Sequence, residues 1–250
     1  MTDSKVPALP KQKTKKEKSS KKLLLILFLF FITVLVVLFF QSSLSRITEV
    51  HIKGNRNLTL EQIEQASGVS KGDHYFLTLS KKVEENVAKL PTVASVKVTK
   101  RFPGELTIEI KEFSKVGYTI DQDGNKQMVM ENGVRLPAEE TNQMLDRPIL
   151  TGWSETDSHY QELCKVLGGL SESDLEDISE IRPDPMTAYP DGIKLFPAVK
   201  LGAKVEIITT IGFLPEKASY IGPFVKSWKE ENNVSSGVIK MLESDSGKAI

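Results

Sequence analysis

Residues 23–40 read LLLILFLFFITVLVVLFF, eighteen consecutive positions without a charge, a proline or a glycine. At about 1.5 Å of rise per residue, an α-helix of this length covers roughly 27 Å, which is close to the hydrocarbon thickness of a bilayer. We therefore predict a single transmembrane helix over residues 23–40. No second run of this kind follows in the sequence.

The charges beside this run predict its orientation. Residues 1–22 hold eight Lys against Asp3 and Glu17, a net charge of +6, whereas Arg46 is the nearest basic residue on the other side. The positive-inside rule then places residues 1–22 in the cytoplasm as a basic, disordered tail and residues 41–250 outside, in a single-pass type II arrangement. A second interpretation is that the lysines bind anionic lipid.

The same run is too long for a cleaved signal peptide, whose apolar region has about 7 to 15 residues followed by small residues at a cleavage site. No Ala-x-Ala pattern follows residue 40, so an uncleaved anchor is the preferred interpretation.

The outer part of the chain is mildly acidic. The whole chain has a net charge of zero, so residues 41–250 carry −6, which argues against a nucleic-acid partner. Cys164 is the only cysteine in the sequence, and an internal disulfide is therefore excluded. Apolar cores must hold the outer part together, most naturally as two domains of about 100 residues each.

The first outer segment begins with a strand and a helix. Val50 and Ile52 alternate with polar neighbours, which predicts a half-buried strand. Thr59 and Gln62 match the Thr-x-x-Gln capping box, so a helix is expected to begin after Thr59 and to end at Gly68.

A second helix and a hairpin complete this segment. Ser80 is the expected cap of the helix, and Pro91 closes it. Apolar and polar residues alternate over residues 94–98 and again over 106–110, on either side of a turn at residues 101–104. The order is strand, helix, helix, strand, strand. Two helices can cover only one face of so small a sheet, which predicts an α+β domain.

Two stretches of this segment carry a family resemblance. Residues 50–55, VHIKGN, and residues 101–112, RFPGELTIEIKE, resemble the polypeptide-transport-associated (POTRA) domain. Placed directly after one membrane span with a Lys-rich head, they make the chain similar to the bacterial cell-division family called FtsQ or DivIB. The resemblance implies a POTRA domain over residues 46–113.

The sequence after residue 113 predicts a mixed β domain with helices over residues 114–242 and a flexible tail over residues 243–250. Asp123-Gly124 and Asn132-Gly133 are tight-turn dipeptides that favour a strand meander. The other expected elements are a helix over residues 160–170, a short helix carrying Leu175, Ile178 and Ile181, strands over 191–196 and 203–209, a helix from Pro215 that Gly222-Pro223 kinks or splits, and a last strand over 238–242.

No catalytic constellation is evident among the reactive side chains. His51, His74 and His159 are scattered, and His159 lies five positions before Cys164, so the two do not share a helix face. Cys164 is predicted to be a buried structural thiol. Residues 121–125, DQDGN, begin like a calcium loop but continue without its glycine and glutamate, which favours a hairpin turn. We predict no enzyme activity, no cofactor and no metal.

The resemblance implies a divisome scaffold at the division septum. Its expected partners are bitopic proteins of the FtsL and DivIC (FtsB-like) type, and through them it would position and regulate septal peptidoglycan synthesis. Two other classes stay open: a membrane-anchored envelope hydrolase or peptidoglycan-binding protein, and an outer-membrane assembly component, which would carry tandem domain copies and a β-barrel.

Strand addition at an open sheet edge is the expected binding mode. The candidate residues are Val238, Ile239, Lys240, Met241 and Leu242, because nothing after this strand is expected to cover it. On that hypothesis Ile239→Pro abolishes partner binding without unfolding the domain. The alternative is a closing strand without a partner. A secondary edge is expected at Val50, His51, Ile52 and Lys53.

Overall fold

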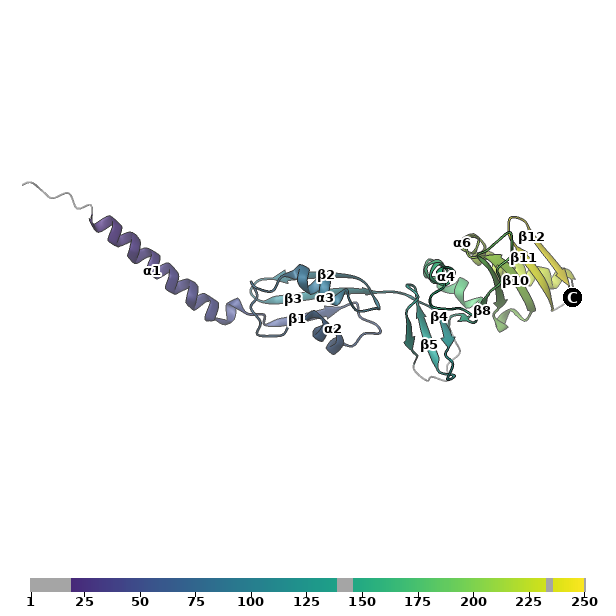
Figure 1. Ribbon diagram of the computed structural model, residues 1–250, viewed down its shortest axis with the longest axis horizontal. Helices are drawn as coiled ribbons and strands as arrows, with labels where there is room; N and C mark the ends of the chain where they lie inside the picture. The colour runs from purple at the N-terminus through teal and green to yellow at the C-terminus, as the bar shows by residue number, and fades with distance from the viewer. Residues whose placement is uncertain (1–18, 139–145, 233–235, 250) are drawn as a thin grey trace, which may run out of the picture.

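The computed structural model describes residues 19–138, 146–232 and 236–249. Figure 1 shows a long helix, α1 (Ser19–Gln41), followed in line by two modules. The first module holds β1 to β3, and the second holds β4 to β12. Most of the predicted basic tail lies outside the described residues.

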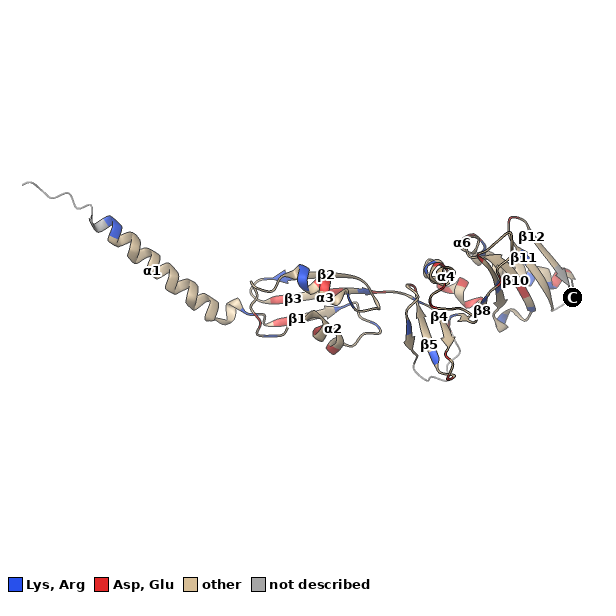
Figure 2. Cartoon of the chain, in the orientation of Figure 1, with Lys and Arg blue, Asp and Glu red and all other residues tan. Residues whose placement is uncertain are grey.

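Helix α1 contains the whole predicted span. Its Leu, Ile and Phe side chains are largely exposed on all sides, and Figure 2 shows no charge along it beyond its first turn. Within the described residues, α1 is the one helix long and apolar enough to cross a membrane. A helix that is apolar all round and unburied by protein fits a lipid environment.

The first module confirms the predicted α+β order. Its sheet has the order β1-β3-β2, in which β1 runs parallel and β2 antiparallel to β3. Ile63 of α2 and Val83 of α3 pack against Leu106 and Ile108 of the sheet in one buried cluster. The elements are β1 (Glu49–Lys53), α2 (Leu60–Ser67), α3 (Ser80–Val87), β2 (Val93–Arg101) and β3 (Glu105–Glu112).

The structure confirms one of the two helix caps predicted for this module. Thr59 and Gln62 form the predicted capping box, and Gly68 ends α2 in the left-handed region with φ of 65°. The expectation for Ser80 is wrong, because the extended cap residue is Leu79 and Ser80 already belongs to the first turn of α3. A side chain within the helix cannot take the capping position.

The second module is built on a nine-stranded sheet with the order β12-β11-β10-β9-β8-β7-β4-β5-β6. Helix α4 packs on β4 and β5, and α6 packs on β9. The elements are β4 (Lys115–Ile120), β5 (Lys126–Met130), β6 (Arg135–Pro137), β7 (Ile149–Leu150), α4 (Ser158–Gly168), α5 (Glu172–Glu176), β8 (Ile178–Pro183), β9 (Gly192–Pro197), β10 (Lys204–Thr210), α6 (Leu214–Asn232), β11 (Ser236–Met241) and β12 (Asp245–Ala249).

Two expected helices of this module differ in the structure. Ile178 and Ile181 lie in β8 and not in a helix, because a β-bulge between Ile178 and Glu180 turns side chains three positions apart to the same buried face. Helix α6 continues through Pro223 without a break, so the expected split at Gly222-Pro223 is wrong, while a kink there stays a prediction. Burial of Ile221 and Val225 on either side of the proline offsets the lost backbone hydrogen bond.

Candidate functional site

The margin of the nine-stranded sheet at the C-terminal end is closed by one more strand than the sequence predicts. Strand β11 lies between β10 and β12, and β12 pairs with it in antiparallel register, Ile239 opposite Gly247 and Val238 opposite Lys248. The expectation that nothing covers Val238 to Leu242 is therefore wrong. The segment 245–249 reads DSGKA and has no apolar alternation, so the sequence carries no signal for this strand.

Four of the five predicted binding residues, Val238 to Met241, are consequently part of the sheet interior, whereas Leu242 follows the end of β11. Ile239 and Met241 are fully buried, Lys240 is exposed, and Val238 and Leu242 are half-buried. Since Ile239 has strands on both sides, a proline there would disrupt the sheet itself. Ile239→Pro therefore cannot separate binding from folding.

Strand β12 is held close to helix α6. A Cβ atom added at Gly247 would lie 2.4 Å from Nε1 and 2.6 Å from Cδ1 of Trp228. The Trp228 side chain is buried, and its Nε1 has no hydrogen-bond partner among the described residues. Only glycine at position 247 allows the backbone to approach the indole this closely.

Strand β12 is the outermost strand at this margin. Its inner side pairs with β11, and no described strand pairs with its outer side. The outward backbone N–H and C=O groups of an edge strand can pair with an added peptide. At the other end of the sheet, β6 has only three residues, Arg135–Pro137, and one of them is a proline. The C-terminal margin is therefore the longer edge.

The secondary candidate, β1, is an outer strand of the small sheet. It pairs with β3 only, and His51 and Lys53 are exposed while Val50 and Ile52 are half-buried. Nε2 of His51 lies 3.1 Å from Oε2 of Glu49. A hollow beside the strand is lined by Thr48, Glu49, Val50, His51, Glu64, Val69, Ser70 and Lys71.

The loop after β1 is fastened by a buried carboxylate. Glu112 accepts hydrogen bonds from the backbone N–H groups of Arg56 at 2.7 Å, Asn57 at 3.0 Å and Leu58 at 3.2 Å, and from Nδ2 of Asn57 at 2.8 Å. Burial opposes its ionisation, but these hydrogen bonds together outweigh burial and lower the pKa of Glu112 below its ordinary value.

The turn before this loop needs a glycine. Gly54 has φ of 86°, and a Cβ atom there would lie 2.0 Å from the carbonyl oxygen of Ile110. The two stretches that carry the family resemblance therefore contact each other, since Gly54 approaches β3 and Glu112 binds the loop that follows Gly54.

The side chains considered for chemistry are not assembled into a site. Cys164 is fully buried, as predicted, and burial raises the pKa of its thiol to about 12. His159 is half-exposed and lies 3.6 Å from Asp157 at the start of α4. Among the described residues, no group of three or more His, Cys, Asp or Glu side chains could hold a metal ion.

The predicted hairpin turn at residues 121–125 is confirmed. Oδ1 of Asp121 accepts hydrogen bonds from the backbone N–H groups of Asp123 at 2.9 Å and Asn125 at 2.8 Å. The turn joins β4 to β5. The hydrogen bond from the Asn125 N–H is the main cause that lowers the pKa of Asp121. The carboxylate of Asp121 thus stabilises the turn.

Known proteins resemble the chain along most of its length. A family model for the FtsQ-type POTRA domain matches residues 45–113. The cell division protein DivIB of Paenibacillus polymyxa is 36% identical over 246 residues, which is 98% of this chain and 92% of that protein. DivIB of Bacillus anthracis is 34% identical over 174 residues, 69% of this chain and 63% of that protein.

A solved structure also aligns with part of the chain. It is the major extracytoplasmic domain of the trans isomer of DivIB from Geobacillus stearothermophilus, with 25% sequence identity and a TM-score of 0.38. The alignment covers 49% of this chain and 98% of that domain.

Proposed function

Because this chain belongs to the DivIB family of bacterial cell division proteins, we propose that it is a non-enzymatic scaffold that holds other division proteins through its outer modules. Membership of the family makes it a component of the division machinery. The resemblance predicted from residues 50–55 and 101–112 is confirmed by these relatives.

The proposed anchor is α1, with the N-terminus in the cytoplasm and both modules outside. Eight lysines lie directly before the span, whereas Arg46 is the nearest basic residue after it, and this asymmetry supports the type II orientation. The corresponding domain ranges are a basic tail over 1–22, a span over 23–40, a POTRA domain over 46–113 and a β domain over 114–242. Strand β12 continues the sheet of the β domain into residues 245–249.

The proposed partners are bitopic division proteins of the FtsL and DivIC type, bound at the C-terminal margin. One observation carries this part of the proposal: β12 is the outermost strand and offers open backbone groups, while its own side chains include no large apolar residue. A partner segment in extended conformation would add to β12 by backbone hydrogen bonds. Strand β11, which contains Val238 to Met241, then holds β12 in place.

Removal of residues 243–250 tests this margin. The full chain and the shortened chain are placed in lipid nanodiscs, and their affinities for the outer segments of FtsL-type and DivIC-type proteins are compared. Two or three lost backbone hydrogen bonds at about 1 kcal/mol each predict a loss of affinity on the order of 100-fold. Circular dichroism checks that the shortened chain keeps its fold, because β11 still pairs with β10.

Two outcomes would count against addition to β12. Unchanged affinity would mean that this margin is not the binding site. A gain in affinity would mean that the partner takes the place of β12 and pairs directly with Val238 to Leu242, the strand predicted from the sequence.

We propose β1 as a second, recruiting margin, supported by its exposed outer position in the small sheet. A fluorescent fusion with Lys53→Glu is expected to reach the division septum less efficiently than the unaltered fusion, because the exposed cation is reversed. Equal septal signal would remove β1 from the proposal.

A further inference from the structure

The end of the first module beside α1 exposes a cluster of large apolar side chains. Phe76 is 46% exposed, Leu77 70% and Phe102 55%. We define the apolar collar as Leu44, Phe76, Leu77, Leu79 and Phe102, all of which are exposed. Exposed apolar side chains gathered at one place mark a contact surface more often than scattered ones do.

The apolar collar is continuous with the end of α1. The ring centroid of Phe76 lies 5.7 Å from that of Phe39 and 6.4 Å from that of Phe40, the last two residues of the apolar run. Phe76 in turn lies 6.3 Å from Phe102, in the turn between β2 and β3. A chain of aromatic rings therefore leads from the helix onto the module.

Hydrogen bonds from the Ser45 side chain and between backbone groups fix the module on the end of this helix. The hydroxyl of Ser45 donates to the carbonyl oxygen of Phe40 at 2.8 Å, and the carbonyl of Ser45 accepts from the N–H of Tyr75 at 2.9 Å. The N–H of Ile47 donates to the carbonyl of Asp73 at 2.8 Å. The segment that carries Phe76 and Leu77 is thus tied to the helix end through residues 45–47.

Membrane dimensions then set the depth of the apolar collar. The run over residues 23–40 spans about 27 Å and the hydrocarbon core about 30 Å, so Phe39 and Phe40 lie at the hydrocarbon boundary. The headgroup layer adds roughly 5 to 7 Å on each side. The rings of Phe76 and Phe39 are 5.7 Å apart, which places Phe76 within the headgroup layer or at its outer margin. Phe and Leu are among the apolar side chains that interfacial segments bury at this depth.

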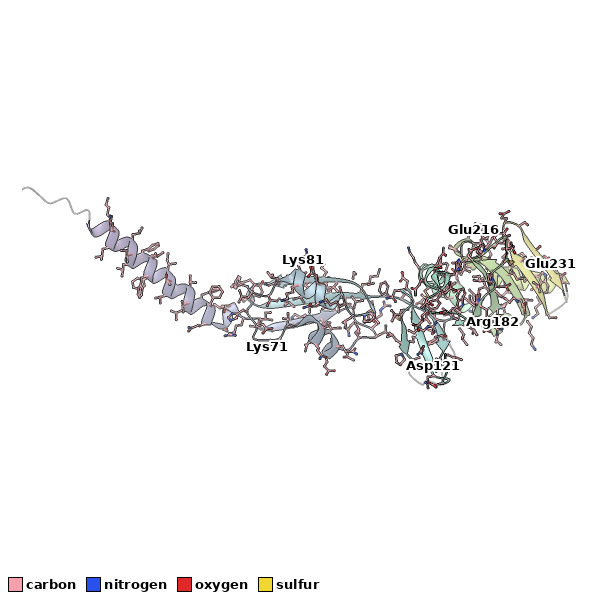
Figure 3. All side chains as sticks on the ribbon, viewed as in Figure 1. Lys71, Lys81, Asp121, Arg182, Glu216 and Glu231 are labelled. Atoms are coloured by element: carbon pink, nitrogen blue, oxygen red, sulfur yellow. The ribbon has the colours of Figure 1, made fainter. Side chains whose placement is uncertain are left out.

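Exposed cations lie on the chain segments that carry the apolar collar. Arg46, Lys71 and Arg101 are exposed, and Figure 3 shows Lys71 on the first module near the end of α1. Nζ of Lys100 lies 4.2 Å from the centroid of the Tyr75 ring and donates to the carbonyl oxygens of Tyr75 and Thr78. Apolar side chains rimmed by Lys and Arg suit the interface of a bilayer that contains anionic lipid.

We propose that the apolar collar inserts into the outer interfacial layer of the membrane that α1 spans, so that the first module is a second membrane contact and not only a domain tethered above it. The occupant of this surface is lipid. The inference rests on α1 as the span and goes beyond partner binding at the far margin, because it fixes how the first module stands on the membrane.

Spin labelling of the full chain in liposomes of phosphatidylcholine and phosphatidylglycerol tests the proposal. A nitroxide is attached at Leu77→Cys, or at Val199→Cys as the control, because Val199 is 87% exposed in the second module. Cys164 stays in place, since it is buried and does not take the label. Collision with oxygen, which concentrates in lipid, is compared with collision with a water-soluble nickel complex.

The oxygen-to-nickel accessibility ratio is expected to be several-fold higher at position 77 than at position 199. Phe76→Ser with Phe102→Ser in the Leu77→Cys chain should lower the ratio towards the value at position 199, whereas Ile120→Ser, an exposed apolar residue of the second module, should leave it unchanged. Equal ratios at positions 77 and 199 would overturn the proposal. Exclusion of both reagents at position 77 would also overturn it, because protein would then cover the apolar collar.

Flotation of the same liposomes separates this proposal from the assignment of the span. A chain that fails to float with lipid would refute α1 as the anchor. A chain that floats but shows a water-like ratio at position 77 would refute only the insertion of the apolar collar.

Discussion

The two ends of the outer region offer opposite kinds of surface. Beside α1, the apolar collar exposes large side chains on backbone that is largely paired, since residues 45–47 and 72–75 bond to one another. At the far end, β12 exposes an unpaired outer side among the described strands but carries small or polar side chains. Apolar side chains suit lipid and open backbone suits a peptide, so we propose a different kind of partner for each end.

The modules between these ends have separate cores. One buried cluster contains residues of the first module, and another contains residues of the second. Only residues 113 and 114 connect β3 to β4, and Figure 1 shows a narrow join there. We expect a substitution in one module to leave the other largely unaffected.

The largest effect is expected for Trp228→Ala. The side chain is buried under β12, so its loss should cost about 3 to 5 kcal/mol in the free energy of unfolding of the second module and should loosen the partner-binding margin. Amide hydrogen exchange resolved by module measures this loss. Tyr220→Ala on the same helix is the control, because Tyr220 is exposed and should change stability by less than about 0.5 kcal/mol. Faster exchange in β3 would show that the modules are coupled.

Glu112→Ala should act on the first module alone. The lost charge-assisted hydrogen bonds to Arg56, Asn57 and Leu58 predict a cost of about 1.5 to 3 kcal/mol. Urea unfolding followed by hydrogen exchange of β3 measures it. Glu109→Ala, an exposed residue of the same strand, is the control.

Glu112 also predicts a pH dependence. Its pKa is lowered in the folded state, so the stabilisation is present at neutral pH and is lost as the pH falls below the unfolded carboxyl pKa of about 4.3 towards the lower folded value. The unaltered chain should therefore lose stability in acid more steeply than Glu112→Gln. If the free energy of unfolding fell equally with pH in the unaltered chain and in Glu112→Gln, this role of the carboxylate would be contradicted.

Gly247→Val should weaken partner binding about tenfold, which corresponds to about 1.4 kcal/mol. The added side chain meets the Trp228 indole and pushes β12 away from its place beside β11. Calorimetry with the outer segment of an FtsL-type partner measures the affinity. Ser246→Val, at the exposed neighbouring position, is the control. An equal loss for both variants would mean that steric displacement by Trp228 is not the cause.

The smallest effect is expected at the first helix cap. Thr59→Ala should destabilise the first module by about 1 kcal/mol, because the Thr59 hydroxyl accepts a hydrogen bond from the Gln62 N–H at 3.2 Å. Ser80→Ala should change stability by less than about 0.5 kcal/mol, since Ser80 is not a cap. Thermal unfolding of the paired variants checks the difference. A larger loss for Ser80→Ala would favour the cap predicted from the sequence.

The sequence predicts elements whose side chains carry the signal. The span and the hairpin of β2 and β3 follow from local apolar patterns, the capping box follows from the polar pair Thr59 and Gln62, and the structure contains each of them. The family resemblance follows from residues 50–55 and 101–112, whose contacts through Gly54 and Glu112 explain why these residue types occur together.

The errors occur where backbone pairing decides the structure. Strand β12 has no apolar alternation, and its place depends on pairing with β11 and on the fit of Gly247 to Trp228, which lies 19 positions earlier in the sequence. The bulge that turns Ile178 and Ile181 to one face of β8 imitates a helical spacing. The apolar collar joins residues from the turn after α1, the turn before α3 and the hairpin, and no local pattern connects them.

Hydrogen exchange of the full chain in nanodiscs, with and without the outer segment of an FtsL-type or DivIC-type protein, tests the central claim most directly. Backbone pairing at the C-terminal margin predicts slower exchange at alternate amides of residues 245–249 when the partner is bound, with no change in β6. Unchanged exchange across 245–249 together with new protection elsewhere in the second module would contradict it.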